Sequence, residues 1–105
     1  MNRFARYEAR ANQDIEEIFD YLDQRSEIAA DRFYDAVNKT VQQLLSMPEL
    51  GERCQFRNPL TKGMRVWQVS GFSNYLLFYR VQNDALQILR VIHGARDYAA
   101  IFNEK

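Results

Sequence analysis

The chain has 105 residues, with 14 basic and 14 acidic side chains and a hydrophobic content of 47%. A chain of this length can bury one core without disulfides or metals, so we expect a single domain over residues 1–105. The zero net charge argues against strong direct binding of nucleic acid, because proteins that grip phosphates normally carry a basic excess. A local basic patch remains compatible with this balance.

The composition also excludes several kinds of site and location. One histidine and one cysteine are too few ligands for a structural zinc or iron–sulfur site, and we expect no metal and no cofactor. The sequence has no apolar run of 18 residues and no apolar stretch of a secretory signal near its start, so we expect no membrane association. The single Cys54 cannot form an internal disulfide, which favours a cytoplasmic protein.

The first half of the chain predicts one strand and two helices. Residues Arg3–Tyr7 alternate as in a short strand, and about Ala9–Gln24 carries one apolar stripe of a helix. The acids of that helix are assigned to its solvent face: Asp14, Glu16, Glu17, Asp20 and Asp23. A second helix follows over about Glu27–Met47, with Ser26 as its N-cap and Pro48 as its end. Their short connection predicts an antiparallel helical hairpin.

The second half predicts three consecutive strands. Met64–Val69 alternates, Gly71–Asn74 reads as a turn, and Tyr75–Val81 is apolar and aromatic. The pair Asn83–Asp84 has the composition of a tight hairpin turn. The run Leu86–Ile92 is almost continuously apolar and rich in β-branched residues, which is typical of a strand buried on both faces.

Two further segments complete the pattern. Residues Glu49–Gly63 are expected to form a loop, the most basic window of the chain, with Arg53, Arg57 and Lys62. Residues Tyr98–Asn103 predict a short terminal helix.

These elements predict a two-layer α+β domain of order β-α-α-β-β-β-(α). An antiparallel meander sheet would carry the helical hairpin on one face. No predicted element remains to cover the other sheet face, although large apolar side chains must point there. We therefore expect an exposed apolar partner surface.

The end of the last strand holds the first candidate site. His93 titrates near neutral pH and could act as a general acid or base. Alternatively, it caps the strand end by a hydrogen bond to the backbone. Arg96 and Asp97 follow in the turn, where they could bind a charged or polar target. Alternatively, Asp97 is the N-cap of the terminal helix and Arg96 is solvated.

Arginines in or beside the strands form a second candidate site. Arg65, Arg80 and Arg90 would make a cationic site on the open face if the register aligns them, flanked by Trp67 and Tyr79. The alternatives are side chains that extend to water or form ion pairs with acids of the helical hairpin.

Six segments together resemble the RelE/ParE superfamily of type II toxin–antitoxin toxins, and more closely its ParE branch. They are A-N-Q-D-I-E-E-I-F-D-Y-L at 11–22, A-A-D-R-F-Y at 29–34, L-L-S-M-P-E-L-G at 44–51, G-M-R-V-W at 63–67, Y-L-L-F-Y-R-V at 75–81 and I-L-R-V-I-H-G-A-R-D at 88–97. The last segment is the most specific, and the resemblance spans nearly the whole chain.

The resemblance implies the same fold, and a ParD-like antitoxin whose disordered tail folds over the toxin. ParE-like members imply inhibition of DNA gyrase, whereas RelE-like members imply ribosome-dependent mRNA cleavage. Metal-free RNA cleavage needs a base, an acid and cations around the phosphate. Here Arg65, Arg80 and His93 are the available parts, and Lys62 is the single lysine of the loop before the meander.

The sequence therefore favours a gyrase inhibitor that is not an enzyme, with mRNA cleavage as the alternative. The proposed docking edge comprises His93, Arg96 and the terminal segment Tyr98–Lys105. The candidate target-binding residues are Arg65, Arg80, Arg90, His93, Arg96 and Asp97. The candidate antitoxin-binding residues are Ile18, Tyr21, Phe33, Val37, Trp67 and Tyr79.

Overall fold

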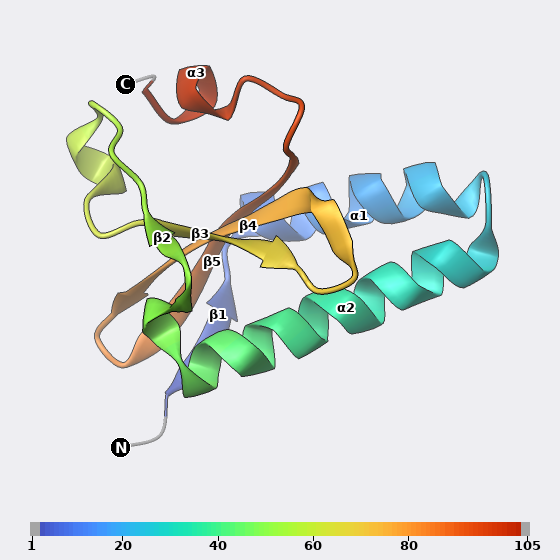
Figure 1. The fold of residues 1–105 in the computed structure, drawn as a ribbon, viewed down its shortest axis with the longest axis horizontal. Coiled ribbons are helices and arrows are strands. Elements are labelled where there is room, and N and C mark those ends of the chain that lie inside the picture. The colour runs from blue at the N-terminus through green and yellow to red at the C-terminus, as the bar shows by residue number, and fades with distance from the viewer. Residues whose placement is uncertain (1–2, 104–105) are drawn as a thin grey trace.

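The computed structural model describes residues 3–103. Its elements in chain order are β1 (Phe4–Tyr7), α1 (Ala9–Asp23), α2 (Glu27–Ser46), η1 (Pro48–Leu50), β2 (Glu52–Arg53), η2 (Pro59–Thr61), β3 (Arg65–Val69), β4 (Phe72–Gln82), β5 (Ala85–His93) and α3 (Tyr98–Asn103). Figure 1 shows α1 and α2 side by side, with their connecting turn pointing away from the sheet. None of the helices in this part of the chain is long and apolar enough to cross a membrane.

The strands form one five-stranded sheet in the order β1-β5-β4-β3-β2. All neighbours are antiparallel except β1, which pairs in parallel with β5 over residues 85–88. The β4–β5 turn is the tight pair Asn83–Asp84, in which both φ angles are positive, as a two-residue hairpin loop requires. The predicted α+β fold, with its meander and helical hairpin, is confirmed.

The helical hairpin packs on one face of the sheet and closes the main core. The side-chain oxygen of Ser26 accepts a hydrogen bond from the backbone of Ala29 at 3.2 Å, so the predicted N-cap of α2 is confirmed. The core combines the apolar stripes of α1 and α2 with inward residues of β3, β4 and β5. Its buried members include Ala11, Ile15, Phe33, Val37, Leu44, Val69, Leu77, Tyr79, Leu86, Ile88 and Val91.

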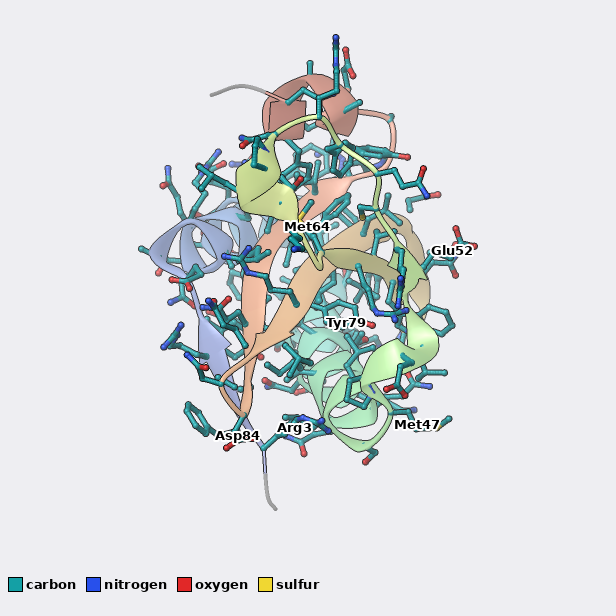
Figure 2. The ribbon with its side chains drawn as sticks, turned by 90° about the vertical axis from the view of Figure 1, so that its left-hand side faces the viewer. Arg3, Met47, Glu52, Met64, Tyr79 and Asp84 are labelled. Atoms are coloured by element: carbon teal, nitrogen blue, oxygen red, sulfur yellow. The ribbon has the colours of Figure 1, made fainter. Side chains whose placement is uncertain are left out.

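A second cluster covers the opposite face, so the expectation of an uncovered sheet face is wrong. Met64, Phe78, Ile92 and Phe102 are buried together. The loop before β3 and helix α3 supply this cover, and Figure 2 shows the segment around Met64 in front of the strands, with α2 behind them. Phe102 packs on Phe78 with ring centroids 4.6 Å apart. The loop and the six-residue helix α3 therefore cover the face on which an exposed apolar partner surface was expected.

Two element boundaries also differ from the prediction. Residues Glu52–Arg53, expected in a loop, form β2 and pair with the start of β3. Strand β4 begins at Phe72, so the turn before it is confined to Ser70 and Gly71 instead of spanning residues 71–74. Gly71 has a φ of 77°, a conformation that glycine adopts without a steric penalty.

Candidate target-binding site

His93 lies at the last position of β5, opposite Tyr75 of β4. The two rings meet edge to face, with centroids 5.1 Å apart. The Nδ1 atom of His93 accepts a hydrogen bond from the backbone N–H of Ala95 at 3.0 Å. Because Nδ1 is an acceptor here, the neutral ring carries its proton on Nε2. The strand-capping alternative for His93 is therefore the observed one.

Arg96 and Asp97 have different surroundings in the turn after β5. The Asp97 side chain accepts a hydrogen bond from the backbone of Ala100 at 3.1 Å, so Asp97 caps α3 as the alternative interpretation predicts. Arg96 is exposed and takes part in no ion pair within residues 3–103. Of Arg96 and Asp97, therefore, Arg96 is the side chain that is free to bind a target.

A pocket of about 290 Å³ lies between α1 and the ends of β4 and β5. Its lining combines aromatic, aliphatic and charged groups: Glu17, Ile18, Tyr21, Tyr75, Val91, Ile92, His93 and Arg96. Burial raises the pKa of Tyr75, as does nearby Tyr21, while the positive charge of Arg25 opposes the shift. Arg25 also stacks over the exposed Tyr21 ring, 4.2 Å from its centroid. The pocket thus offers aromatic side chains with one cation, Arg96, in its lining and a second, Arg25, stacked on Tyr21.

Arg90 forms an ion pair with α1 and does not line this pocket. Its Nε donates to Asp14 Oδ2 at 2.7 Å and its Nη2 donates to Asp14 Oδ1 at 3.1 Å. The same carboxylate accepts the backbone N–H of Val91 at 3.0 Å. The ion-pair alternative for Arg90 is therefore observed, and the assignment of Asp14 to a solvent face is wrong, since Asp14 is only 4% exposed.

The arginines do not share an open face. Arg65 lies opposite Tyr79 on the helix-covered side, whereas Arg80 follows Tyr79 and so points to the other side. Arg65 donates to the Gly51 carbonyl at 2.7 Å, and Arg80 donates to the Leu60 carbonyl at 2.8 Å and to a side-chain oxygen of Gln87 at 2.9 Å.

The register also separates the three nuclease candidates. Arg80 stands five positions along β4 from Tyr75, the strand partner of His93. At about 3.3 Å per residue this is roughly 17 Å. Arg65, opposite Tyr79, is roughly 13 Å from the same end of the sheet. One phosphate cannot contact all three side chains.

The candidate antitoxin-binding residues divide by burial. Phe33 and Tyr79 have no exposed surface, because both lie in the core between the hairpin and the sheet. Val37 is 2% exposed and borders a pocket of about 340 Å³ between α1, α2 and β1. Tyr21 is 50% exposed, and Ile18 and Trp67 are partly exposed. Direct contact with a partner is therefore open to Ile18, Tyr21 and Trp67, and not to Phe33 or Tyr79.

The described residues hold no group of three or more His, Cys, Asp or Glu side chains that could bind a metal ion. Residues 5–98 match the family described as the ParE toxin of the type II toxin–antitoxin system parDE. The chain belongs to this family. It is thus a type II toxin–antitoxin toxin of the ParE/RelE superfamily.

Two known proteins are similar to this ParE-family toxin. It is 35% identical to "Toxin RelE3" of Caulobacter vibrioides over 86 residues, which cover 81% of this chain and 87% of that protein. It also resembles the solved structure titled "Chromosomal ParDE TA system from P. aeruginosa", with a TM-score of 0.68 and 20% identity over 89% of this chain and 96% of the other. At this identity the structural match supports the fold alone.

The sequence patterns of this ParE-family toxin missed Asp14 and Glu17 as site residues. Asp14 lies three positions after Ala11 and four before Ile18, on the apolar stripe of α1. An acid at that spacing is a signal for a buried ion pair, and Arg90 in an apolar strand is its natural partner. Glu17 gives no comparable signal, because its place in the pocket depends on how α1 crosses β5.

Proposed function

We propose that this protein inhibits DNA gyrase by binding it, stabilises cleaved DNA in the gyrase complex and so blocks replication. The proposed contact is the pocket between α1 and β5, centred on Tyr21, His93 and Arg96. As gyrase acts on cytoplasmic DNA, we place the toxin in the cytoplasm. We also propose that a ParD-like antitoxin binds the toxin and keeps it inactive until the two proteins separate.

One observation carries the choice of a binding function over a nuclease function. The register separates His93 from Arg80 by roughly 17 Å along β4. General acid–base catalysis of phosphodiester cleavage requires the proton donor or acceptor and the phosphate-binding cations within hydrogen-bond reach of one substrate. Arg65, Arg80 and His93 lack that arrangement, whereas an aromatic pocket with exposed cations suits a protein surface.

The antitoxin proposal rests on exposed apolar side chains of the hairpin. Tyr21, Ile28 and Tyr34 are 50%, 63% and 44% exposed. A partner segment that folds on the toxin would bury these groups, and an amphipathic helix in the groove beside Tyr34 is the mode that such a surface fits. Covering Tyr21 would also cover one wall of the pocket proposed to bind gyrase. Neutralisation would then follow from direct competition.

The proposal is tested with purified gyrase, ATP and supercoiled or relaxed plasmid. Wild-type toxin should inhibit supercoiling and accumulate linear, cleaved plasmid. The variants Tyr21→Ala and Arg96→Gln should lose at least 10-fold in potency, as expected for interface contacts worth more than about 1.4 kcal/mol. Arg32→Gln, an exposed change on α2, is the control and should retain wild-type potency.

The packing of the terminal segment decides which variants can test the proposed gyrase contact. Deleting the segment from Tyr98 onward would remove Phe102 from the second core cluster, so a loss of activity would report unfolding. Residues 104 and 105 of the predicted docking segment lie outside the described residues. Point variants at Tyr21 and Arg96 avoid this difficulty. Unimpaired supercoiling by a folded wild-type toxin would contradict the proposal.

Ribosome-dependent mRNA cleavage is the second candidate. It is supported by the 35% identity to a protein named RelE3 and by an available His93 at the pocket. In that case wild-type toxin would cut mRNA on translating ribosomes, and His93→Ala or Arg96→Gln would abolish the cuts. An Arg80→Gln variant with normal cleavage would agree with the distance between Arg80 and His93.

A further inference from the structure

The zero net charge hides a strong separation of charge along the chain. From Arg53 to Asn83 the sequence has five basic residues and no acidic one, whereas residues 14–35 have eight acidic and two basic residues. The first segment forms the loop, β3 and β4, and the second forms most of α1 and the first half of α2. The molecule therefore has an acidic helical hairpin and a basic region on the sheet and its covering loop.

Three of these cations line one hollow, and a fourth, Arg80, reaches the turn beside it from the other face of the sheet. A pocket of about 550 Å³ is lined by Arg53, Lys62 and Arg65, together with Cys54, Gln55, Gly63 and Met64. Arg80 reaches the adjacent turn, where its Nη1 donates to the Leu60 carbonyl at 2.8 Å. We call Arg53, Lys62, Arg65 and Arg80 the basic patch. Figure 2 faces this side of the molecule, and the Glu52 side chain points to its margin, away from Met64.

Two cations of the basic patch are held opposite each other by the sheet. Arg53 of β2 and Arg65 of β3 are direct cross-strand partners. Like charges in such positions destabilise a sheet pair. Within residues 3–103 the ion pairs involve Arg6, Arg10 and Arg90, so no acid neutralises any cation of the basic patch. Unneutralised like charges held this close suit an external anion.

Two of the guanidinium groups are held in place by the fold. Arg65 donates to the Gly51 carbonyl at 2.7 Å, and Arg80 donates both to Leu60 and to Gln87. An arginine has five N–H donors, so each group keeps donors beyond those that anchor it. Anchored guanidinium groups lose little conformational entropy on binding and suit phosphate oxygens.

We propose that the basic patch binds the phosphate backbone of duplex DNA. The inference rests on the proposed function and adds to it: the toxin contacts the DNA that gyrase holds, as well as gyrase itself. The acidic helical hairpin is repelled by the DNA phosphates, so the protein approaches the duplex with its basic patch. Binding by this patch alone is weak and salt-dependent, because only a few phosphates are neutralised.

The proposal is tested by fluorescence anisotropy with a short labelled DNA duplex across a series of salt concentrations. The variant Arg53→Gln/Lys62→Gln removes two cations whose side chains make no hydrogen bond or ion pair in residues 3–103, so the fold should persist. The control Arg32→Gln/Lys39→Gln removes the same charge from exposed positions of α2. Circular dichroism checks that all three proteins are folded.

The expected result follows from counterion release. Losing two phosphate contacts should reduce the slope of log K against log salt by about 1.8 and weaken binding about 60-fold at about 0.1 M salt. The control should bind as the wild type does within about 3-fold, because its lost charges are remote from the patch. Equal losses in both variants, or no duplex binding by the wild type at low salt, would overturn the proposal.

An acidic peptide is the competing ligand for such a surface. Polyglutamate serves as the probe: if its binding depends on Arg53 and Lys62 while duplex binding does not, the patch recognises acidic protein and the DNA proposal is wrong. The anisotropy measurement contains no gyrase, so it can succeed or fail independently of the proposed target. With gyrase present, the Arg53→Gln/Lys62→Gln variant should still bind the enzyme but accumulate less cleaved plasmid.

Discussion

Replacing Asp14 by alanine should remove a large part of the stability of this toxin. The Asp14 carboxylate accepts hydrogen bonds from Arg90 at 2.7 and 3.1 Å and from the Val91 backbone at 3.0 Å. The Asp14 and Arg90 side chains are only 3% and 13% exposed. Alanine leaves a buried guanidinium without its counterion and a buried N–H without an acceptor. Breaking a buried pair in this way costs about 3–5 kcal/mol.

The assay is urea unfolding followed by circular dichroism. With a slope of about 1.5 kcal/mol/M, the expected loss lowers the midpoint by about 2–3 M. Asp20→Ala is the matched control, because Asp20 is an exposed acid on the same helix, and it should stay within about 0.5 kcal/mol of the wild type. If Asp14→Ala unfolds at the same urea concentration as Asp20→Ala, the reasoning is refuted.

A double-mutant cycle separates the charge pair from the lost backbone contact. Arg90→Met keeps most of the side-chain volume and removes the charge. Asp14→Ala/Arg90→Met should therefore be more stable than the sum of the two single losses predicts, because no buried charge is left alone. The remaining loss measures the unsatisfied Val91 N–H, about 1–3 kcal/mol.

Two substitutions and one alkylation experiment test other parts of the fold. Tyr79→Phe should cost about 1–3 kcal/mol in thermal unfolding, because its hydroxyl donates to the Pro48 carbonyl at 2.6 Å and accepts the Gly51 N–H at 2.9 Å. Burial, aided by the charge of a nearby glutamate, raises the pKa of Cys54 to about 11 from 9.0. Iodoacetamide at pH 8 should therefore alkylate it about 100-fold more slowly than an exposed thiol. Phe102→Ala should cost about 3–5 kcal/mol by urea unfolding, because it removes a ring that packs on Phe78 in the second core cluster.

Each of these three has an outcome that contradicts it. A Tyr79→Phe protein as stable as the wild type would mean that water replaces both hydroxyl contacts. For Cys54, equal alkylation rates in buffer and in urea would exclude a protected thiol. The raised pKa also gives a pH dependence: Cys54 favours the folded state below about pH 9, and this contribution is lost as the pH rises toward 11. A Phe102→Ala protein with unchanged stability would show that the packing of α3 on the sheet does not contribute to the stability of the fold.

The sequence predicted the elements whose side chains repeat with a clear period. The stripes of α1 and α2, the Ser26 cap and the Asn83–Asp84 turn are all encoded locally, and each lies where predicted. Strand β2 was missed because two residues carry no periodic signal and pair only because β3 lies beside them. The start of β4 was missed because Ser73 and Asn74 have the composition of a turn.

The candidate site was harder to predict than the fold, since it depends on contacts between distant segments. His93 and Arg96 were identified from their place after a buried strand. The pairing of Asp14 with Arg90 was not, because an acid beside an apolar stripe was assigned to water. Helix α3 was predicted as an element, but its packing on Phe78 depends on the tertiary path of the chain after β5.

The parallel pairing of β1 with β5 has a consequence for how the toxin reaches its active form. Phe4 pairs with Ala85, and Tyr7 pairs with Ile88, so this contact joins segments far apart in the chain. During synthesis the sheet cannot close until residues 85–88 have been made, and such non-local contacts form late in folding. His93 and Arg96 come later still. A translation product that stops before residue 85 therefore lacks both the closed sheet and the proposed binding site, so active toxin cannot appear until synthesis has passed Arg96.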